Sequence, residues 1–470
     1  MGGWKYVRLS GGKILNYEDN LIVAFNSEHS LVLIGDAWSV KNMDLTPYDF
    51  VCGYNKDISV ESVLLEEINW CGRYCLIVNN VIYTDSAALL QVFYDERNVS
   101  SNVHLLCEAD NLKINESRII HGIGPDFLPG TMTSCDDVRR LLPSESFDLN
   151  SNKRMPRKIL TEGIPSYSSN LVQEFCSYFT QSLINMRSYF PQSTIWLALT
   201  GGKDSRTLMS LLENSGIEYK TFTLEHSNIS HGDIEIPRLL AKQANREHLY
   251  ILQKKKDKKL EEKYTSFTSG MAVDQGRNFY SCGQYDELLM NSSDVIVLRS
   301  GIWEFSTEYF FGGDKSKTDI NDLEEIFPLL KVNDKMRSSI NEWLNTIKAD
   351  SLNSDLTLDE RLYLEIRVAC WLASGEQGFD LMKNITSVQP LNSRKLLSML
   401  LAFPLSARVR KEHEDLIIKY ACKGLCDIPY DKNVKNNIPI ARKLKKKISK
   451  CIDLVSYYGI QNAIKIRRKV

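Results

Sequence analysis

The sequence predicts an α/β protein with a β-rich N-terminal part and a parallel sheet covered by helices. Short runs rich in valine, isoleucine and aromatic residues occupy much of positions 21–110, whereas strand-like and helical segments alternate from position 167 onward. Strands that alternate with helices at this spacing are typical of a parallel sheet with helices on both faces. The chain has 470 residues, which is more than one ordinary hydrophobic core can organise, so we expect two or three domains.

Turn residues divide the first part into β-rich runs. Asn79 and Asn80 lie between two apolar runs, a pattern typical of a two-residue β-hairpin turn. Positions 122–143 are punctuated by Gly and Pro, and the chain stays polar to position 157, which indicates a linker. We therefore predict a first domain over 1–160, a second over 161–440 and a basic tail over 441–470. The β-rich runs are Leu21–Phe25, Ser30–Trp38, Tyr74–Asp85 and Asn102–Asp110.

The second part starts with a helical pattern at Tyr167 and continues as alternating strands and helices. From position 323 the sequence is mostly helical, with apolar stripes at helical spacing. The predicted strands are Ile195–Leu199, Tyr219–Leu224, Leu249–Leu252 and 293–298, and the predicted helices between them are Arg206–Asn214 and Ile234–Asn245.

The composition is that of a globular protein, with 43% hydrophobic and 25% charged residues, which excludes wholesale disorder. A formal net charge of −1 gives no overall field for nucleic acid, so no nucleic acid partner is expected. The charge is uneven, because positions 441–470 carry ten Lys or Arg residues and one acid, Asp453. No apolar run reaches the length of a membrane span and the N-terminus has no secretory pattern, so we expect a cytoplasmic location.

The eleven cysteines are scattered and include no CxxC pair. Two pairs, Cys71 with Cys75 and Cys422 with Cys426, are four positions apart, which by itself does not define a zinc site. We predict free thiols in a reducing compartment.

A Thr-Gly-Gly-Lys-Asp-Ser segment lies where a predicted strand meets a predicted helix. Ligands of a parallel sheet bind beyond the carboxyl ends of its strands, where backbone N–H groups at helix N-termini attract anions. Gly201 and Gly202 allow the chain to approach a phosphate closely, and the hydroxyls of Thr200 and Ser205 add donors. Asp204 repels a phosphate by itself but is a suitable ligand for Mg²⁺ beside one.

The spacing excludes the two commoner nucleotide loops, because neither GxxxxGK[ST] nor GxGxxG occurs here. A glycine turn capped by Asp or Ser, with no ligand, is the alternative interpretation. Lys203 and Arg206 either add charge for phosphates or lie exposed at the start of the helix. For Asp233, which opens the following helix, an N-cap is the simpler role.

The segment from Thr200 to Ser205 resembles the pyrophosphatase loop of the ATP-pyrophosphatase (adenine-nucleotide α-hydrolase-like) superfamily. Its members cleave ATP between the α- and β-phosphates and include asparagine, GMP and NAD synthetases and tRNA thiolases. Flanking segments resemble the asparagine synthetase-like family in one consistent order along almost the whole chain. These segments are Trp70–Tyr94, Phe127–Leu149, Val295–Gly313, Val388–Pro404 and Ile428–Asn433.

The resemblance implies an Ntn-hydrolase-like αββα domain followed by an adenine-nucleotide α-hydrolase-like synthetase domain with a helical C-terminal part. Glutamine-dependent members carry a cysteine nucleophile at position 2, whereas this chain has Gly2 and its first cysteine is Cys52. An N-terminal nucleophile needs that thiolate, so we expect a degenerate first domain without glutaminase activity. β-Lactam synthetase and lasso-peptide cyclases resemble this chain in the same loss, and there an amine on the substrate replaces ammonia.

The activity implied by the resemblance is carboxylate activation with ATP and Mg²⁺, followed by attack of an amine. Thr200, Gly201, Gly202 and Ser205 would hold the pyrophosphate. The metal would be held by Asp204 with Glu308, and Lys432 would neutralise charge in the transition state. The resemblance places the adenine near Leu199 and Leu224, and the backbone of Ser300 and Gly301 near the nucleotide.

Three points stay open in the sequence. The second metal ligand is either Glu304 or Glu308, because the family's Asp–Glu pair is replaced here. No acid stands at positions 386–391 to act as general base, for which Tyr363 and Glu365 are substitutes. Lys432, Leu199 and Leu224 also have plain interpretations, the first as a solvated lysine and the other two as core.

The leading hypothesis is an AMP-forming amide ligase that joins a small-molecule or peptide carboxylate to ammonia or a substrate amine. A catalytically weakened nucleotide-binding or regulatory protein is the alternative from another class. Sulfur transfer to tRNA would require a reactive cysteine pair and an RNA-binding domain, and the sequence indicates neither. The sequence leaves open whether the protein forms a homodimer. The basic tail is either a solvated helix or a surface that makes peripheral contacts with an acidic partner or a membrane.

Overall fold

The computed structural model describes most of the chain. The described residues are 4–9, 14–41, 45–55, 59–107, 111, 127–225, 229–252, 257–271, 285–290, 292, 294–314, 316–383 and 385–430, with single positions at 455, 459 and 462.

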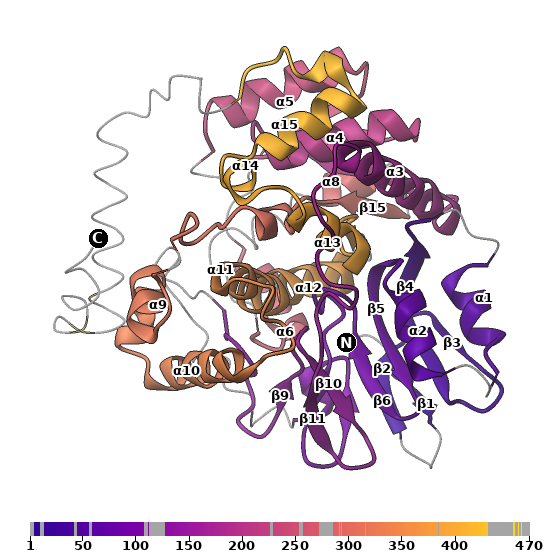
Figure 1. Ribbon diagram of the computed structural model, residues 1–470, viewed down its shortest axis with the longest axis vertical. Coiled ribbons are helices and arrows are strands. Elements are labelled where there is room, and N and C mark those ends of the chain that lie inside the picture. Colours follow the sequence, from indigo (N-terminus) through magenta and orange to yellow (C-terminus); the bar gives the residue numbers. More distant parts are fainter. Residues whose placement is uncertain are drawn as a thin grey trace.

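Two sheets form the N-terminal part, which lies in the lower half of Figure 1. One is antiparallel and has the strand order β11-β10-β6-β5-β4-β3, and the other has the order β1-β2-β8-β7-β9. The strands of the first sheet are β3 (Val23–Phe25), β4 (Leu31–Ser39), β5 (Trp70–Val78), β6 (Val81–Thr84), β10 (Glu145–Asp148) and β11 (Lys153–Pro156). Those of the second are β1 (Trp4–Arg8), β2 (Ile14–Glu18), β7 (Phe93–Tyr94), β8 (Val99–Ser100) and β9 (Arg139–Arg140).

The two sheets pack face to face, with helices outside them. Leu15 of β2 lies in the same buried cluster as Ile34 of β4, which places this core between the sheets. Helices α1 (Pro47–Cys52) and α2 (Val60–Glu67) cover the outer face of the six-stranded sheet. The outer face of the other sheet meets α10 (Asp334–Ala349) of the second part, because Phe93 shares a buried cluster with Trp343. The Ntn-hydrolase-like assignment of this part remains a prediction.

A parallel five-stranded sheet forms the centre of the second part, as predicted. Its order is β14-β13-β12-β15-β16, so the chain moves outward from β12 in one direction and then continues at β15 on the other side. The gap between the ends of β12 and β15 is therefore the topological switch point, where open α/β sheets bind ligands. The strands are β12 (Thr194–Ala198), β13 (Lys220–Leu224), β14 (His248–Ile251), β15 (Val295–Leu298) and β16 (Thr386–Val388).

Helices cover both faces of this sheet. Leu197 of β12 packs in the cluster that holds side chains of α3 (Leu171–Tyr189) and α4 (Lys203–Ser215), whereas its neighbour Trp196 lies in the cluster that holds Phe379 of α12 (Ala373–Lys383). Such alternation is what strands buried on both faces require. The helices of this part are α3 (Leu171–Tyr189), α4 (Lys203–Ser215), α5 (Gly232–Gln243), α6 (Lys258–Phe267), α8 (Asp286–Leu289), α9 (Ile320–Ile326), α10 (Asp334–Ala349), α11 (Leu358–Arg361), a π-helical stretch over Leu362–Leu372, α12 (Ala373–Lys383), α13 (Arg394–Leu401), α14 (Leu405–Val409) and α15 (Glu412–Ala421). Short 3₁₀ turns lie at Val103–Leu105, Trp303–Ser306, Pro328–Lys331 and Lys423–Leu425.

A buried ionic network joins the two parts. Glu67 of α2 accepts hydrogen bonds from Arg394 of α13 at 3.0 Å and from Arg157 at 3.1 Å, and all three side chains are buried. Beside it, Asn392 donates to Asp85 at 2.9 Å. Because a buried ion left without its partner is costly, the first part is packed as a structural component of the second.

Two local predictions from the sequence have clear outcomes. The hairpin at Asn79 and Asn80 is confirmed, with φ of 49° and 68° in the turn between β5 and β6. The strand predicted over Asn102–Asp110 is wrong for its described part, 102–107, because Asn102 caps a 3₁₀ turn at Val103–Leu105, and positions 108–110 lie outside the described residues.

The prediction of free thiols is wrong for one pair, because Cys107 and Cys135 form a disulfide with their Cα atoms 6.4 Å apart. Cys71, Cys75, Cys422 and Cys426 are free. The described histidine, cysteine, aspartate and glutamate side chains form no cluster of three that could hold a metal.

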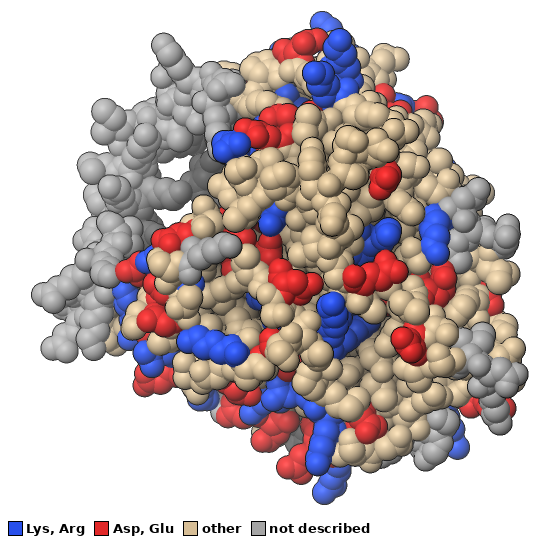
Figure 2. Space-filling model, viewed as in Figure 1, with Lys and Arg blue, Asp and Glu red and all other residues tan. Residues whose placement is uncertain are grey.

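No described helix is long and apolar enough to cross a membrane. On the face drawn in Figure 2, basic and acidic side chains are interspersed rather than gathered into one broad patch of a single sign. The basic tail lies outside the described residues apart from three single positions.

Candidate nucleotide site

The loop after β12 places a helix N-terminus at the switch point of the sheet. α4 begins at Lys203, three residues before the predicted start, so Asp204 and Ser205 belong to its first turn. Gly202 is the N-cap residue, with extended backbone and no side-chain cap. The first N–H groups of α4 therefore have no capping side chain at this position, which suits an anionic ligand.

Hydrogen bonds inside the loop fix the two hydroxyls that were predicted to bind phosphate. The backbone N–H of Thr200 donates to Ser205 Oγ at 3.1 Å, and the two hydroxyl oxygens are 3.0 Å apart. The N–H of Gly201 donates to Asp233 Oδ1 at 2.8 Å. Asp233 is thus a partner of the loop rather than the N-cap of α5, which is His231. An anion bound at Gly201 would have to replace this carboxylate.

Asp204 shares a lysine with Glu304, which lies in the 3₁₀ turn after β15. Nζ of Lys411 donates to Asp204 Oδ1 at 2.6 Å and to Glu304 Oε1 at 2.8 Å. Burial and the Asp204 carboxylate raise the pKa of Glu304. Burial lowers the pKa of Lys411, but Asp204, Glu414 and Glu304 outweigh it, so the net pKa lies above its usual range and the ammonium is retained.

The backbone around Lys411 is held as firmly as its side chain. Lys411 has φ of 55°, a left-handed conformation that is uncommon outside glycine, and it stands directly before α15. Lys203 Nζ donates to the carbonyl oxygen of Lys411 at 3.0 Å and pairs with Asp415 at 2.5 Å. α15 packs against α4 in the upper part of Figure 1, which brings this segment to the loop.

Glu308 lies in another set of contacts. It accepts a hydrogen bond from Thr357 Oγ1 at 2.9 Å, and its φ is 52°. Burial, with the nearby Glu360 carboxylate, raises the pKa of Glu308 to about 7. Of the two candidates left open by the sequence, Glu304 is the one that shares a partner with Asp204, while Glu308 pairs with the N-cap residue of α11.

The remaining residues predicted near the nucleotide have structural contacts of their own. Leu199 is fully buried in the core beside α4, and Leu224 is partly buried at the end of β13. Gly301 donates its N–H to Gln389 Oε1 at 2.9 Å, and its carbonyl accepts from the Tyr363 hydroxyl at 2.8 Å. A Cβ at Gly301 would lie 2.9 Å from Leu372 Cδ2 and 3.2 Å from Gln389 Nε2, so a larger residue there would require these side chains to move. Ser300 lies half-buried just before it.

Arg206 connects the segment that precedes Lys432 to α4, the helix that follows the Thr200 loop. Its buried guanidinium donates to the carbonyl oxygens of Ile428 and Pro429 at 2.6 and 2.7 Å and lies 4.1 Å from the Tyr430 ring centroid. The alternative of an exposed Arg206 is therefore wrong. Lys432 itself lies outside the described residues.

A cavity of about 220 Å³ adjoins the same loops. Gly301 and Glu304 line one side, and Tyr309, Tyr363 and Arg367 line the rest with apolar neighbours. The Arg367 guanidinium lies 3.6 Å from the ring centroid of Trp371 and has no carboxylate partner within the described part of the chain. Glu365 points elsewhere, since it accepts bonds from Ser144 and Trp343 in the core.

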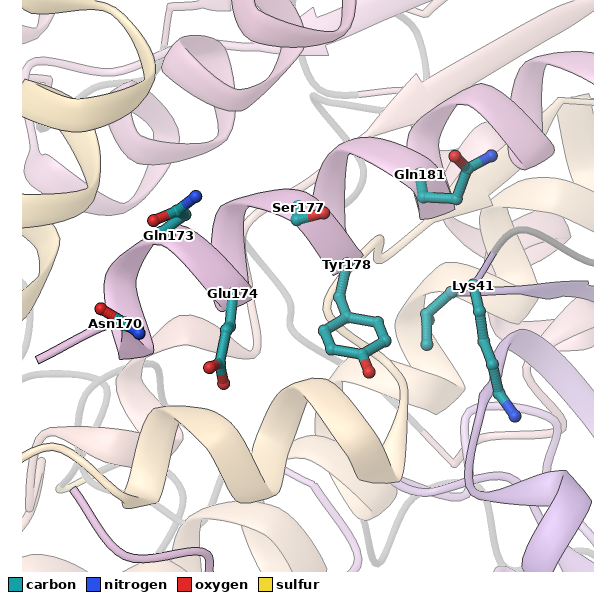
Figure 3. Close-up of a pocket in the computed structure, with 8 residues that line it drawn as sticks. Lys41, Asn170, Gln173, Glu174, Ser177, Tyr178 and Gln181 are labelled. Atoms are coloured by element: carbon teal, nitrogen blue, oxygen red, sulfur yellow. The ribbon is translucent and has the colours of Figure 1, made fainter. Parts of the chain in front are cut away.

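A wider groove of about 500 Å³ lies away from these loops (Figure 3). Its labelled side chains come from Asn170 at the N-cap of α3, from α3 as far as Gln181, and from Lys41 after β4. Most of them are neutral and polar, and the helix N-terminus that borders the groove, that of α3, carries the acidic Glu174 in its first turn. It is less suited to a polyphosphate than the switch point.

The fit of Mg²⁺ can be judged from Asp204 and Glu304. Oxygen ligands lie about 2.0–2.1 Å from Mg²⁺. Both carboxylates instead reach the ammonium of Lys411 at hydrogen-bond distance, and that nitrogen stands where a shared metal ion would have to stand. As arranged, this pair of carboxylates fits an ammonium and does not fit a shared divalent cation.

Comparisons with known proteins give a distant structural likeness. No family model matches the sequence, and no curated protein matches it. Among solved structures, the chain is similar to the NMN synthetase from Francisella tularensis at 15% identity, with a TM-score of 0.22. That match covers 58% of this chain and 100% of the other. A likeness at this level carries no assignment of residues or activity.

Proposed function

We propose that the protein is an ATP-dependent, AMP-forming ligase that activates a carboxylate and transfers it to ammonia or a substrate amine. One observation carries the proposal. The uncapped N-terminus of α4 and the turn that holds Glu304 flank the switch point between β12 and β15, with Asp204 and Glu304 joined by one cation.

The adjoining cavity supports a carboxylate as the second substrate. Arg367 has no carboxylate partner among the described residues, and its guanidinium can bind a carboxylate through parallel N–H donors. Tyr309, Tyr363 and Trp371 offer aromatic walls for an apolar body. Glu304 borders both this cavity and the Asp204 cluster, so an acid held by Arg367 would lie next to the nucleotide loop.

The proposed chemistry has two steps. A carboxylate oxygen of the substrate attacks the α-phosphorus of ATP, the bond from that phosphorus to the bridging oxygen breaks, and pyrophosphate leaves. The N–H groups at the start of α4 stabilise the charge on the departing oxygens. An amine nitrogen then attacks the acyl carbon, loses a proton, and AMP leaves with the electrons of the acyl–oxygen bond. Tyr363 borders the cavity, but its hydroxyl donates to the Gly301 carbonyl and burial raises its pKa well above the usual value, so the phenol is no proton acceptor and the proton of the amine passes to water. Lys432 remains a predicted catalytic residue.

Isotope exchange tests the proposal without knowledge of the amine. Purified protein is incubated with ATP, Mg²⁺, labelled pyrophosphate and a panel of carboxylic acids that have an apolar or aromatic body. We expect one class of acid to drive label into ATP. No exchange across the panel, together with no ATP binding in calorimetry, would reject the ligase.

A nucleotide-binding or regulatory protein is the second candidate, and two contacts favour it. Asp233 already occupies the N–H of Gly201, and Lys411 already occupies Asp204. ATP binding without exchange for any acid would support this candidate over the ligase.

A further inference from the structure

We propose that Lys411 is a built-in cation, which permanently takes the position where Asp204 and Glu304 would otherwise hold a divalent ion. Its role toward a polyphosphate rests on the proposed function, whereas its position between the carboxylates does not.

The contacts of the ammonium support this assignment. Two of its N–H donors are used by Asp204 and Glu304, and a third carboxylate, Glu414, lies 3.9 Å away. Its remaining donor forms no hydrogen bond to any described residue, which leaves it for an oxygen of a bound ligand. One cation thus neutralises two carboxylates that belong to loops 100 residues apart in sequence and still has a donor to offer.

The backbone shows that this position is built and not a chance rotamer of an exposed side chain. Lys411 adopts a left-handed backbone, and its carbonyl oxygen is held by Lys203. A non-glycine residue in this conformation costs free energy and persists only where surrounding contacts enforce it. Its side chain is about one-quarter exposed, so little water competes with the two carboxylates. Withdrawal of the lysine would leave both carboxylates facing each other without a counter-ion.

Manganese titration tests the proposal directly. Free Mn²⁺ is followed by electron paramagnetic resonance in nucleotide-free protein, for the wild type, Asp204→Asn, Lys411→Gly and the double variant Lys411→Gly with Asp204→Asn. Glycine is chosen because it accepts the positive φ at position 411 and removes the ammonium without adding strain. Asn245→Gly is the matched control, since Asn245 also has a positive φ of 53° and is exposed outside the site.

We expect no Asp204-dependent Mn²⁺ site in the wild type or in Asn245→Gly. Lys411→Gly should gain one Mn²⁺ site that binds at least about tenfold more tightly than any site of the wild type, because two carboxylates are freed. The double variant should lose this site. A wild type that binds one Mn²⁺ as tightly as Lys411→Gly, with the binding lost in Asp204→Asn, would overturn the proposal. The wild-type titration decides this even if Lys411→Gly does not fold.

The titration contains no nucleotide, so its outcome is independent of the ligase. Absence of pyrophosphate exchange with an unchanged manganese result would reject the proposed function and keep the built-in cation. Normal pyrophosphate exchange, together with an Asp204-dependent manganese site in the wild type, would keep the proposed function and reject the built-in cation.

Discussion

Lys411 donates a hydrogen bond to Asp204 at 2.6 Å across 207 positions of sequence, and this contact joins α15 to the first turn of α4. It means that the polar centre at the switch point is assembled from the loops after β12 and β15 and from the residue that precedes α15.

Asp204→Asn should reduce pyrophosphate exchange by roughly two to three orders of magnitude, because it removes one of the two anchors of the Lys411 cation beside the reacting phosphates. The measurement is the initial rate of exchange with the best acid of the panel. Asp334→Asn, on the exposed start of α10, is the matched control. Equal rates in Asp204→Asn and the control would contradict this role.

Arg367→Met should raise the apparent KM for the acid by about 10- to 100-fold and leave ATP affinity unchanged, because it removes the guanidinium and keeps an apolar stem over Trp371. Steady-state kinetics with varied acid and calorimetry with ATP separate the two effects. Arg337→Met serves as control, since Arg337 pairs with Glu324 on the surface of α10. A loss of ATP affinity as large as the rise in apparent KM for the acid would place Arg367 at the nucleotide instead.

Glu376→Gln should change the pH dependence of stability. Burial raises the pKa of Glu376 from 4.5 to about 7, so between these two pH values the folded protein binds more protons than the unfolded chain. The free energy of unfolding therefore falls as pH rises through this window, by on the order of 2–3 kcal/mol, and the loss is complete above about pH 7.

Urea unfolding at pH 5 and at pH 7.5 measures this effect. The wild type should lose stability relative to Glu376→Gln between the two pH values. Glu174→Gln on the exposed face of α3 should follow the wild type. A stability difference between wild type and Glu376→Gln that is the same at both pH values would show that Glu376 is already ionised at pH 5.

Arg394→Met should destabilise the whole chain by about 3–5 kcal/mol, because it leaves Glu67 buried with one fewer partner. Thermal unfolding should remain a single transition, since α2 and α13 share this network. Lys395→Met, at the next position of α13 and partly exposed, is the control. Two separate transitions in the variant would show that the two parts fold independently.

The sequence predicted the parallel sheet and the loop at Thr200 because both depend on neighbouring residues. Alternating strands and helices are a periodic signal, and the Thr200–Ser205 segment is continuous. Lys411 carried no comparable signal. It stands in a charged stretch, and only the packing of α15 on α4 brings it to Asp204.

Tertiary contacts also decided the cases where sequence reasoning was open or wrong. Glu304 and Glu308 are four residues apart in a short 3₁₀ segment and the turn that follows it, and the local pattern could not tell which faces Asp204. Asp233 has the position of a helix cap but reaches back to Gly201. The run after Asn102 is apolar like a strand, yet it turns to bring Cys107 to Cys135.

Hydrogen–deuterium exchange with and without α,β-methylene-ATP tests most directly whether the loop at Thr200 binds the nucleotide. The account predicts slower exchange of backbone amides at 200–206 and 299–305 when the analogue is bound, with no change at 173–181 in the groove of α3. It also predicts that Asp204→Asn weakens this protection. Bound analogue that protects the α3 groove and leaves 200–206 unchanged would contradict the account.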